Sequence, residues 1–281
     1  MITFPFGFLG AEAGASVTPP FDDYVNPTAG YSMRKLDSSY SGSAIRVRED
    51  SGNTEADIGF DGSGDLDTTA LLAHTSSNSG FIVKWYDQSG NSYDLAQATT
   101  TAQPKIVDLG SVVMSNGKPA ILYDGAFTNG DFMEQASSAF SGSTAEVNQY
   151  SVQQMISTNT PGIYVNGNNN VYYWVYTSGD SSTSVGLNTG TIAYYKNGSL
   201  ISSPTRGSLF SNFNNDTQTL ATLTGMNMTY FGGSYRDFTI SDWNAGWRLN
   251  AYMQEMIFWR ATDLPTQADV ETNINDYYTI F

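Results

Sequence analysis

An aromatic and polar cluster follows one expected strand, and its side chains have the chemistry that a sugar ring needs. The strand 81–86 ends in Trp85 and Tyr86, and the glycine-closed turn beyond it carries further polar side chains. Aromatic rings present a flat apolar face with a polar edge, which suits sugar rings and protein interfaces equally. The alternative is that the turn is purely architectural. The residues that we predict to contact carbohydrate are Trp85, Tyr86, Asp87, Gln88, Asn91, Tyr173 and Trp174.

A glycine loop places side-chain oxygens at alternate positions, as calcium-binding loops do. Asp61, Ser63 and Asp65 are separated by Gly62 and Gly64. The loop lacks the distal bidentate glutamate of an EF-hand, so a plain turn is the favoured interpretation. No cofactor is expected, and Ca²⁺ is the one ion that the sequence leaves open.

Other active-site chemistries find no support. His74 is the single histidine and the chain has no cysteine, which excludes a zinc cluster of those ligands and a Cys–His pair. No Gly-x-Ser-x-Gly turn is present for a serine nucleophile. We expect His74 to lie in solvent at the end of a helix.

Composition narrows the class of protein. Of the 281 residues, 40% are hydrophobic and only 14% are charged, while glycine and tyrosine are abundant. This mixture is typical of short strands joined by polar turns. The net charge of −15 repels phosphate backbones, so we expect no nucleic-acid partner. No apolar run approaches the length of a membrane span, and we expect no membrane insertion.

Three arginines stand out in so acidic a chain: Arg34, Arg46 and Arg48. Arginine on a strand pairs well with carboxylates. We predict a structural ion-pair network, with a sugar- or carboxylate-binding face as the second interpretation. The expected partners are Asp57, Asp61 and Asp87.

The elements that must position these side chains are mostly short strands. Ser43–Arg48 alternates in polarity, and Asn197-Gly198 is typical of a hairpin turn. Ala251–Trp259 is apolar on both faces, as in a strand covered on each side. Helices are expected only after Asp67, which would cap a short helix, and from Pro265 to the end of the chain. Many strands with few helices predict a β-sandwich.

Two resemblances sharpen this prediction. Segments 30–36, 39–42, 45–48, 56–59 and 83–91 resemble, in order and spacing, the front half of the catalytic domain of fungal-type α-L-arabinofuranosidases. The same block recurs in structural proteins of bacterial viruses and in marine bacterial surface proteins.

The second resemblance lies in the back half of the chain. Ile192–Leu200 and Tyr252–Trp259 resemble the hairpin and the closing strand of laminin-G-like, pentraxin-like and concanavalin-type jelly rolls. Together the resemblances imply an all-β fold, a concanavalin-like jelly-roll β-sandwich over residues 27–281 with a short C-terminal helix.

Residues 1–26 are expected to form an extended N-terminal arm. Prolines and glycines interrupt its apolar residues, so neither a helix nor a long strand is favoured. Exposed phenylalanines are a liability unless they dock, and we favour a neighbouring subunit over the arm's own domain. The predicted docking residues are Phe4, Phe6, Phe8 and Leu9.

The arabinofuranosidase resemblance implies two catalytic carboxylates, as in other retaining glycosidases. In that family the acid/base Asp follows a Gly-Gly pair, and the nearest match here, at 232–234, reads Gly-Gly-Ser. The nucleophilic Glu belongs to a mid-domain strand, yet residues 150–187 contain no Glu and only one carboxylate, Asp180. Asp237 and Asp242 lie nearby in sequence. Both key positions are therefore expected to be lost, and no catalytic residue is predicted.

These observations favour a non-enzymatic structural or adhesion protein of a bacteriophage particle. The first ten residues do not form a signal peptide and the chain has no cysteine, as expected for a virion protein assembled in the host cytoplasm. We expect a homo-oligomer that binds other virion proteins through its arm and contacts glycans of the host surface. The alternatives are a glycoside hydrolase of the α-L-arabinofuranosidase type and a purely architectural capsid or tail subunit without a ligand.

Overall fold

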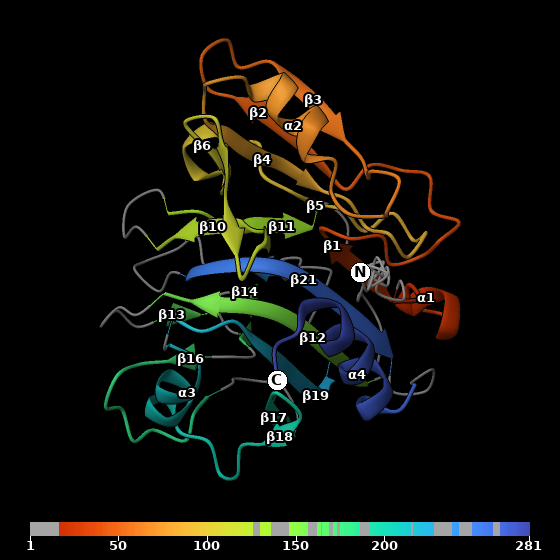
Figure 1. Ribbon diagram of the computed structural model, residues 1–281. Coiled ribbons are helices and arrows are strands. Elements are labelled where there is room, and N and C mark those ends of the chain that lie inside the picture. The colour runs from red at the N-terminus through yellow and green to blue at the C-terminus, as the bar shows by residue number, and fades with distance from the viewer. Residues whose placement is uncertain are drawn as a thin grey trace, which may run out of the picture.

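The chain folds as a β-sandwich of antiparallel strands with a few short helices (Figure 1). The computed structural model describes residues 17–125, 130–135, 146–156, 162–163, 165–168, 171–172, 175–185, 191–214, 216–227, 238–241, 249–260 and 265–281. The predicted all-β jelly-roll class is confirmed.

The first sheet is built around two long neighbouring strands, β12 and β21, which cross the middle of Figure 1. β21 pairs at its far edge with both β1 and β10, and β12 pairs with β19. In order across the sheet the strands are β18 (Ser199–Leu200), β17 (Ala193–Lys196), β19 (Thr219–Asn227), β12 (Glu146–Met155), β21 (Asn250–Arg260) and then β1 (Ala29–Ser32) and β10 (Ile121–Asp124).

The second sheet contains more and shorter strands. Its order is β3 (Glu55–Ile58), β2 (Ile45–Glu49), β4 (Gly80–Trp85), β5 (Leu95–Ala96), β11 (Met133–Gln135), β20 (Thr239–Ile240), β14 (Val165–Asn168) and β15 (Val171–Tyr172). β6 (Lys105–Asp108) also pairs with β4, carries β7 (Ser111–Val112), and joins the two sheets through β10. Separate small pairs are β8 (Met114–Ser115) with β9 (Lys118–Pro119), and β13 (Gly162–Ile163) with β16 (Val175–Tyr176).

The described helices are α1 (Pro20–Asp23), α2 (Thr68–Thr75), the 3₁₀ turn η1 (Thr100–Ala102), α3 (Arg206–Phe213) and α4 (Gln267–Tyr278). The predicted helix start at Asp67 is confirmed, since its carboxylate accepts the N–H of Ala70 at 2.9 Å. α3 was not predicted, although its capping box between Thr205 and Ser208 is a recognisable start signal. None of the helices in the described ranges is long and apolar enough to span a membrane.

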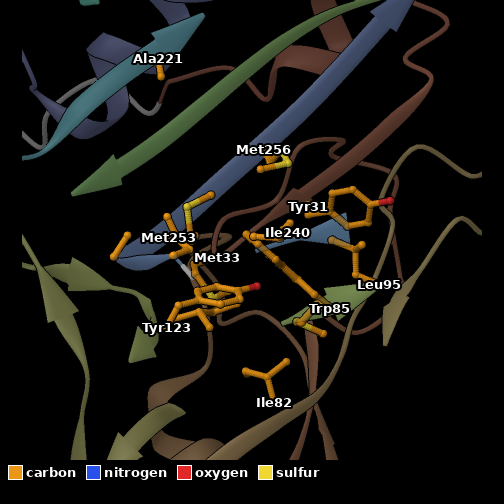
Figure 2. Close-up of a cluster of buried hydrophobic side chains, with 14 of the residues drawn as sticks. Tyr31, Met33, Ile82, Trp85, Leu95, Tyr123, Ala221, Ile240, Met253 and Met256 are labelled. Carbon is orange, nitrogen blue, oxygen red and sulfur yellow. The ribbon is translucent and has the colours of Figure 1, made fainter. Parts of the chain in front are cut away.

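The main core lies between the two sheets (Figure 2). Met253 and Met256 of the first sheet face Ile82, Trp85 and Leu95 of the second. All five side chains are fully buried. Alternation along most of each strand sends every second residue inwards, as the polarity pattern predicted. Met253 and Met256 are three positions apart, and both face the core because the pairing of β12 with β21 shifts register opposite Gln254.

A second core covers the other face of the first sheet. Val270, Ile274 and Tyr278 of α4 pack with Ile257 and Trp259 of β21. β21 is therefore buried on both faces, as its two apolar faces predicted. The hairpin at 197–198 is also confirmed, with positive φ angles of 51° and 75° at its two turn residues.

The end of the predicted arm lies against this second core. Phe21 of α1 is buried, and its ring meets the ring of Trp259 at a centroid distance of 5.5 Å. The predicted docking residues Phe4, Phe6, Phe8 and Leu9 lie outside the described residues, so the docking function of the arm stays a prediction.

Candidate functional site

The segment that follows β4 is largely part of the scaffold. Trp85 is fully buried in the core beside Tyr31, so its ring offers no surface to a sugar, contrary to the prediction. Asp87 is 4% exposed. Its carboxylate accepts hydrogen bonds from the N–H groups of Gly30, Ser89 and Tyr93 at 2.8–3.0 Å, and from the Ser89 hydroxyl at 2.7 Å. Burial raises the pKa of Asp87, and these hydrogen bonds oppose the rise.

Gln88 ties the same turn to the first sheet. Its amide nitrogen donates to the carbonyls of Ser32 and Arg34, and its amide oxygen accepts the N–H of Leu36. The side chain is 2% exposed. Asp87 and Gln88 therefore lock the end of β4 to β1 and the loop after it, and the architectural interpretation of the turn fits their contacts.

Two of the predicted sugar-contacting residues keep accessible surface. Tyr86 is partly exposed and its hydroxyl donates to Asp57 at 2.7 Å. Asn91 is exposed, and its amide nitrogen donates to the carbonyls of Pro27 and Thr28, each at 3.1 Å. Tyr173 and Trp174 lie outside the described residues. Sugar contact at Tyr86 and Asn91 stays a prediction.

The glycine loop is arranged as a turn. Asp61 Oδ1 accepts the N–H groups of Ser63 and Asp65, at 2.8 and 3.1 Å, and Asp65 accepts the hydroxyl of Tyr277. Within the described ranges, no three acidic or histidine side chains are grouped to hold a metal ion. Arg34 and Lys35 line the same hollow as the loop, which opposes a cation there. Calcium binding stays a prediction.

The predicted arginine network is only partly right. Arg46 pairs with Asp57 at 2.7 Å, as expected. Arg34 instead pairs with Glu255, and Arg48 binds the amide oxygens of Gln103 and Asn53. The difference arises because the side chain opposite each arginine depends on strand pairing between distant segments, which composition does not specify.

A straight row of outward side chains crosses the second sheet. Residues directly opposite each other in antiparallel strands project from the same face. Successive registers place one residue per strand in this row, from β3 to β20. The outer row consists of Asp57, Arg46, Lys84, Ala96, Glu134 and Thr239, of which Thr239 is buried.

The cations of the outer row are already paired. Lys84 Nζ lies 3.1 Å from Asp94 and 5.1 Å from the ring centre of Tyr86. Hydrogen bonding from Arg46 lowers the pKa of Asp57 despite its partial burial. This end of the row is therefore a closed network of charges, with no cation left to attract a polyanion.

Glu134 is different, and the sequence analysis missed it. Its neighbours Met133 and Gln135 point inwards and are buried, whereas Glu134 is partly exposed on the outer face. Within the described part of the chain its carboxylate has no hydrogen-bond or ion-pair partner. The small Ala96 lies opposite it on one side and Thr239 on the other. The inward–outward alternation of three residues was too short a signal to reveal this carboxylate.

Two further facts concern the carboxylates near Glu134. Asp94 lies two residues before Ala96, just outside β5, and an extended backbone there would place it diagonal to Glu134, where Cβ atoms are typically about 7–8 Å apart. β20, which pairs with Glu134, begins five residues after the Gly-Gly-Ser match at 232–234. Asp180, by contrast, accepts the N–H of Ser182 and lies 3.7 Å from Arg206, so its described contacts are within its own loop and with the start of α3.

Comparison with known proteins finds similar solved structures but no match by sequence. No protein-family model matches the sequence, and no curated protein matches it significantly. One similar solved structure is an arabinofuranosidase complexed with arabinofuranosyl-α-1,2-xylobiose, with a TM-score of 0.56. Another is a Glu-to-Gln mutant of a GH54 α-L-arabinofuranosidase soaked with 4-nitrophenyl α-L-arabinofuranoside, with a TM-score of 0.57. A third is a GH54 α-L-arabinofuranosidase soaked with a cyclic sulfate inhibitor, with a TM-score of 0.53.

Each of these structures is 16% identical to the chain, which is a likeness of fold. Each alignment covers 92% of this chain and 64% of the other, so the chain spans about two thirds of their length. The sequence-based prediction that the protein is not an enzyme is overturned by this comparison, because all three neighbours are glycosidases. The chain has the sandwich fold of GH54 α-L-arabinofuranosidases.

Proposed function

We propose that the chain is a glycoside hydrolase that acts on α-L-arabinofuranosyl groups. The observation that carries this proposal is the match of the fold to arabinofuranosidases over 92% of the chain. The resemblance of the front half of the sequence to the same enzymes agrees with this match of fold. Fold alone does not specify chemistry, so the proposal also needs carboxylates in a suitable place.

Glu134 and Asp94 are the carboxylates that we assign to the reaction. Glycosidases hold their two carboxyl groups about 5–9.5 Å apart on the two sides of the bond that breaks. The diagonal placement of Glu134 and Asp94 is compatible with this range. Ser234, at the position of the family's acid, has no proton that titrates in the required range.

The surroundings of the two carboxylates suggest different roles. Asp94 lies 3.1 Å from Lys84 Nζ, and we assign it the role of the group that stabilises positive charge on the sugar or attacks it. Glu134 has no cation beside it in the described structure and lies next to Ala96, and we assign it the role of the acid that gives its proton to the leaving oxygen.

The test is release of arabinose from arabinofuranosyl-α-1,2-xylobiose, and of nitrophenol from 4-nitrophenyl α-L-arabinofuranoside. Glu134→Gln should lower the rate by about 10²–10⁴, the usual contribution of a general acid. Glu146→Gln is the matched control, because Glu146 is an exposed glutamate at the start of β12, in the other sheet. No release by the unmodified chain would refute the function, and equal rates for both variants would refute the role of Glu134.

The location in a bacteriophage particle, the homo-oligomer and the binding of other virion proteins through residues 1–26 stay predictions from the sequence. Mass spectrometry of purified particles would test the location. A hydrolase that acts on surface polysaccharide is compatible with a position on a particle, so the two proposals can be tested separately.

A further inference from the structure

A separate pocket lies beside the turn that follows β4. Its volume is about 460 Å³, within the range of about 300–1,000 Å³ usual for small-molecule sites. It forms where four segments meet: α1 with the loop 25–28, the loop after β1 at Asp37, the turn 89–93, and the end of β21 at Arg260.

The walls of this pocket are held in place before any ligand arrives. Asn91 bonds the carbonyls of Pro27 and Thr28, which joins the turn to the opposite loop. The buried carboxylate of Asp87 accepts hydrogen bonds from the N–H groups of Ser89 and Tyr93, which holds the turn in shape. A preformed site loses little conformational entropy on binding, which favours affinity for a small ligand.

The polar groups of the pocket include both donors and acceptors. Asp37 uses Oδ1 to accept the N–H and hydroxyl of Ser39, which leaves Oδ2 for another donor. Arg260 is exposed, and within the described ranges no carboxylate lies within ion-pair distance of its guanidinium. The amide of Asn26 adds a further donor and acceptor, and Asn91, whose amide N–H groups donate to Pro27 and Thr28, adds its amide oxygen as an acceptor.

Apolar groups form the rest of the wall. Phe21 and Val25 line one side, and the ring of Tyr93 lies on the turn. Val25 is 67% exposed, so its side chain is accessible to a ligand. Asn26 beside it has a φ of +58° immediately before Pro27, a conformation that costs energy. Strained residues of this kind cluster at ligand sites.

We propose that this pocket binds one unit of an uncharged glycan, such as a pentose. A sugar ring has an apolar C–H face for the Val25 and Tyr93 side and hydroxyls that donate to Asp37 while accepting from Arg260. A polyanion would meet Asp37 and a chain of net charge −15. A purely apolar ligand would leave the charged groups desolvated and unpaired.

This binding does not depend on hydrolysis at Glu134, which lies on the outer face of the second sheet. It would hold a glycan on the protein whether or not the chain cleaves it. Asn91, which the sequence predicted to contact a sugar, would then do so as part of the pocket wall.

The experiment is a titration of the ¹⁵N-labelled chain with L-arabinose, D-xylose and xylobiose, and with D-glucuronate as an anionic probe. We expect at least one neutral sugar to shift the amide signals of residues 89–93 in a saturable way. Val25→Trp should fill the pocket and weaken that binding by at least about tenfold. Leu200→Trp, at another exposed apolar site, is the matched control and should bind as the unmodified chain does.

Unchanged thermal unfolding of both tryptophan variants would show that their folds are intact. The proposal is overturned if no neutral probe shifts these signals, if Val25→Trp binds as well as Leu200→Trp, or if glucuronate binds more tightly than the neutral sugars. Loss of arabinose release with binding intact would count against the proposed hydrolase and leave the pocket assignment standing.

Discussion

Replacing Arg34 with methionine should destabilise the fold strongly, because it leaves the carboxylate of Glu255 buried without its cation. Arg34 is 3% exposed and Glu255 is fully buried. The guanidinium bonds both carboxylate oxygens, with Nε on Oε2 at 2.8 Å and Nη2 on Oε1 at 3.0 Å. The hydroxyls of Ser32 and Tyr278 also reach Oε2. Among the described residues, only Arg34 donates to Oε1.

The magnitude follows from this geometry. Burial disfavours the charged guanidinium, but the attraction of Glu255 outweighs it and raises the pKa of Arg34. Removing one member of a buried pair costs about 3–5 kcal/mol, a large part of the roughly 5–15 kcal/mol that stabilises a typical domain. Arg34 also donates to Asn273 and stacks 4.5 Å from the ring centre of Tyr277, so α4 should loosen as well.

The assay is urea unfolding followed by tryptophan fluorescence, with hydrogen exchange to report on α4. Arg46→Met is the matched control, because Arg46 and Asp57 are 39% and 40% exposed and an exposed pair contributes about 0–1 kcal/mol. The double variant Arg34→Met with Glu255→Met should recover most of the loss, since it leaves no buried charge. The reasoning fails if Arg34→Met costs no more than Arg46→Met, or if the double variant is as unstable as the single one.

Three further perturbations test other parts of the structure. Hydrogen bonds from the Ser51 hydroxyl and the Thr54 N–H lower the pKa of Glu49 from 4.5 to about 2. The unfolded chain therefore binds more protons than the folded chain between these pH values, and the free energy of unfolding should fall as the pH falls through them. Glu49→Gln should flatten that part of a curve of unfolding free energy against pH, and an unchanged slope would contradict the assignment. Gln153 is fully buried, and neither of its amide atoms has a hydrogen-bond partner in the described structure. Gln153→Met should therefore leave the urea midpoint unchanged or raise it. A fall in unfolding free energy above about 2 kcal/mol would mean that the amide has a partner. Trp85→Ala should cost about 3–5 kcal/mol in the same assay because it empties a core position, and a loss below about 1 kcal/mol would show that the ring is not packed as described.

The residues behind the arabinofuranosidase resemblance are largely those that hold the two sheets together. Asp87 reaches Gly30, and Gln88 reaches Ser32, Arg34 and Leu36, all within the segments that carry the resemblance. A likeness built on such contacts predicts the fold well. It carries little information about catalysis, which explains why the sequence indicated the sandwich and identified no catalytic residue.

Local signals in the sequence were sufficient for the class of fold and several of its elements. The alternation of polarity predicted the strands, Asp67 predicted the start of α2, and Asn197-Gly198 predicted the hairpin. Each of these depends on a few neighbouring residues whose conformational preferences act locally, and these preferences can be recognised without knowing what lies across the sheet.

Only the tertiary structure decided which side chains meet. Arg34 and Glu255 are 221 positions apart, and Glu134 gains its neighbours from strands that precede and follow it by dozens of residues. Trp85 lies inside the core because the parity of its strand turns it there, although its type is equally suited to a sugar site. Pairing between distant strands sets the register, and a shift of one residue would exchange every inward side chain for an outward one, so the site had to come from the folded chain.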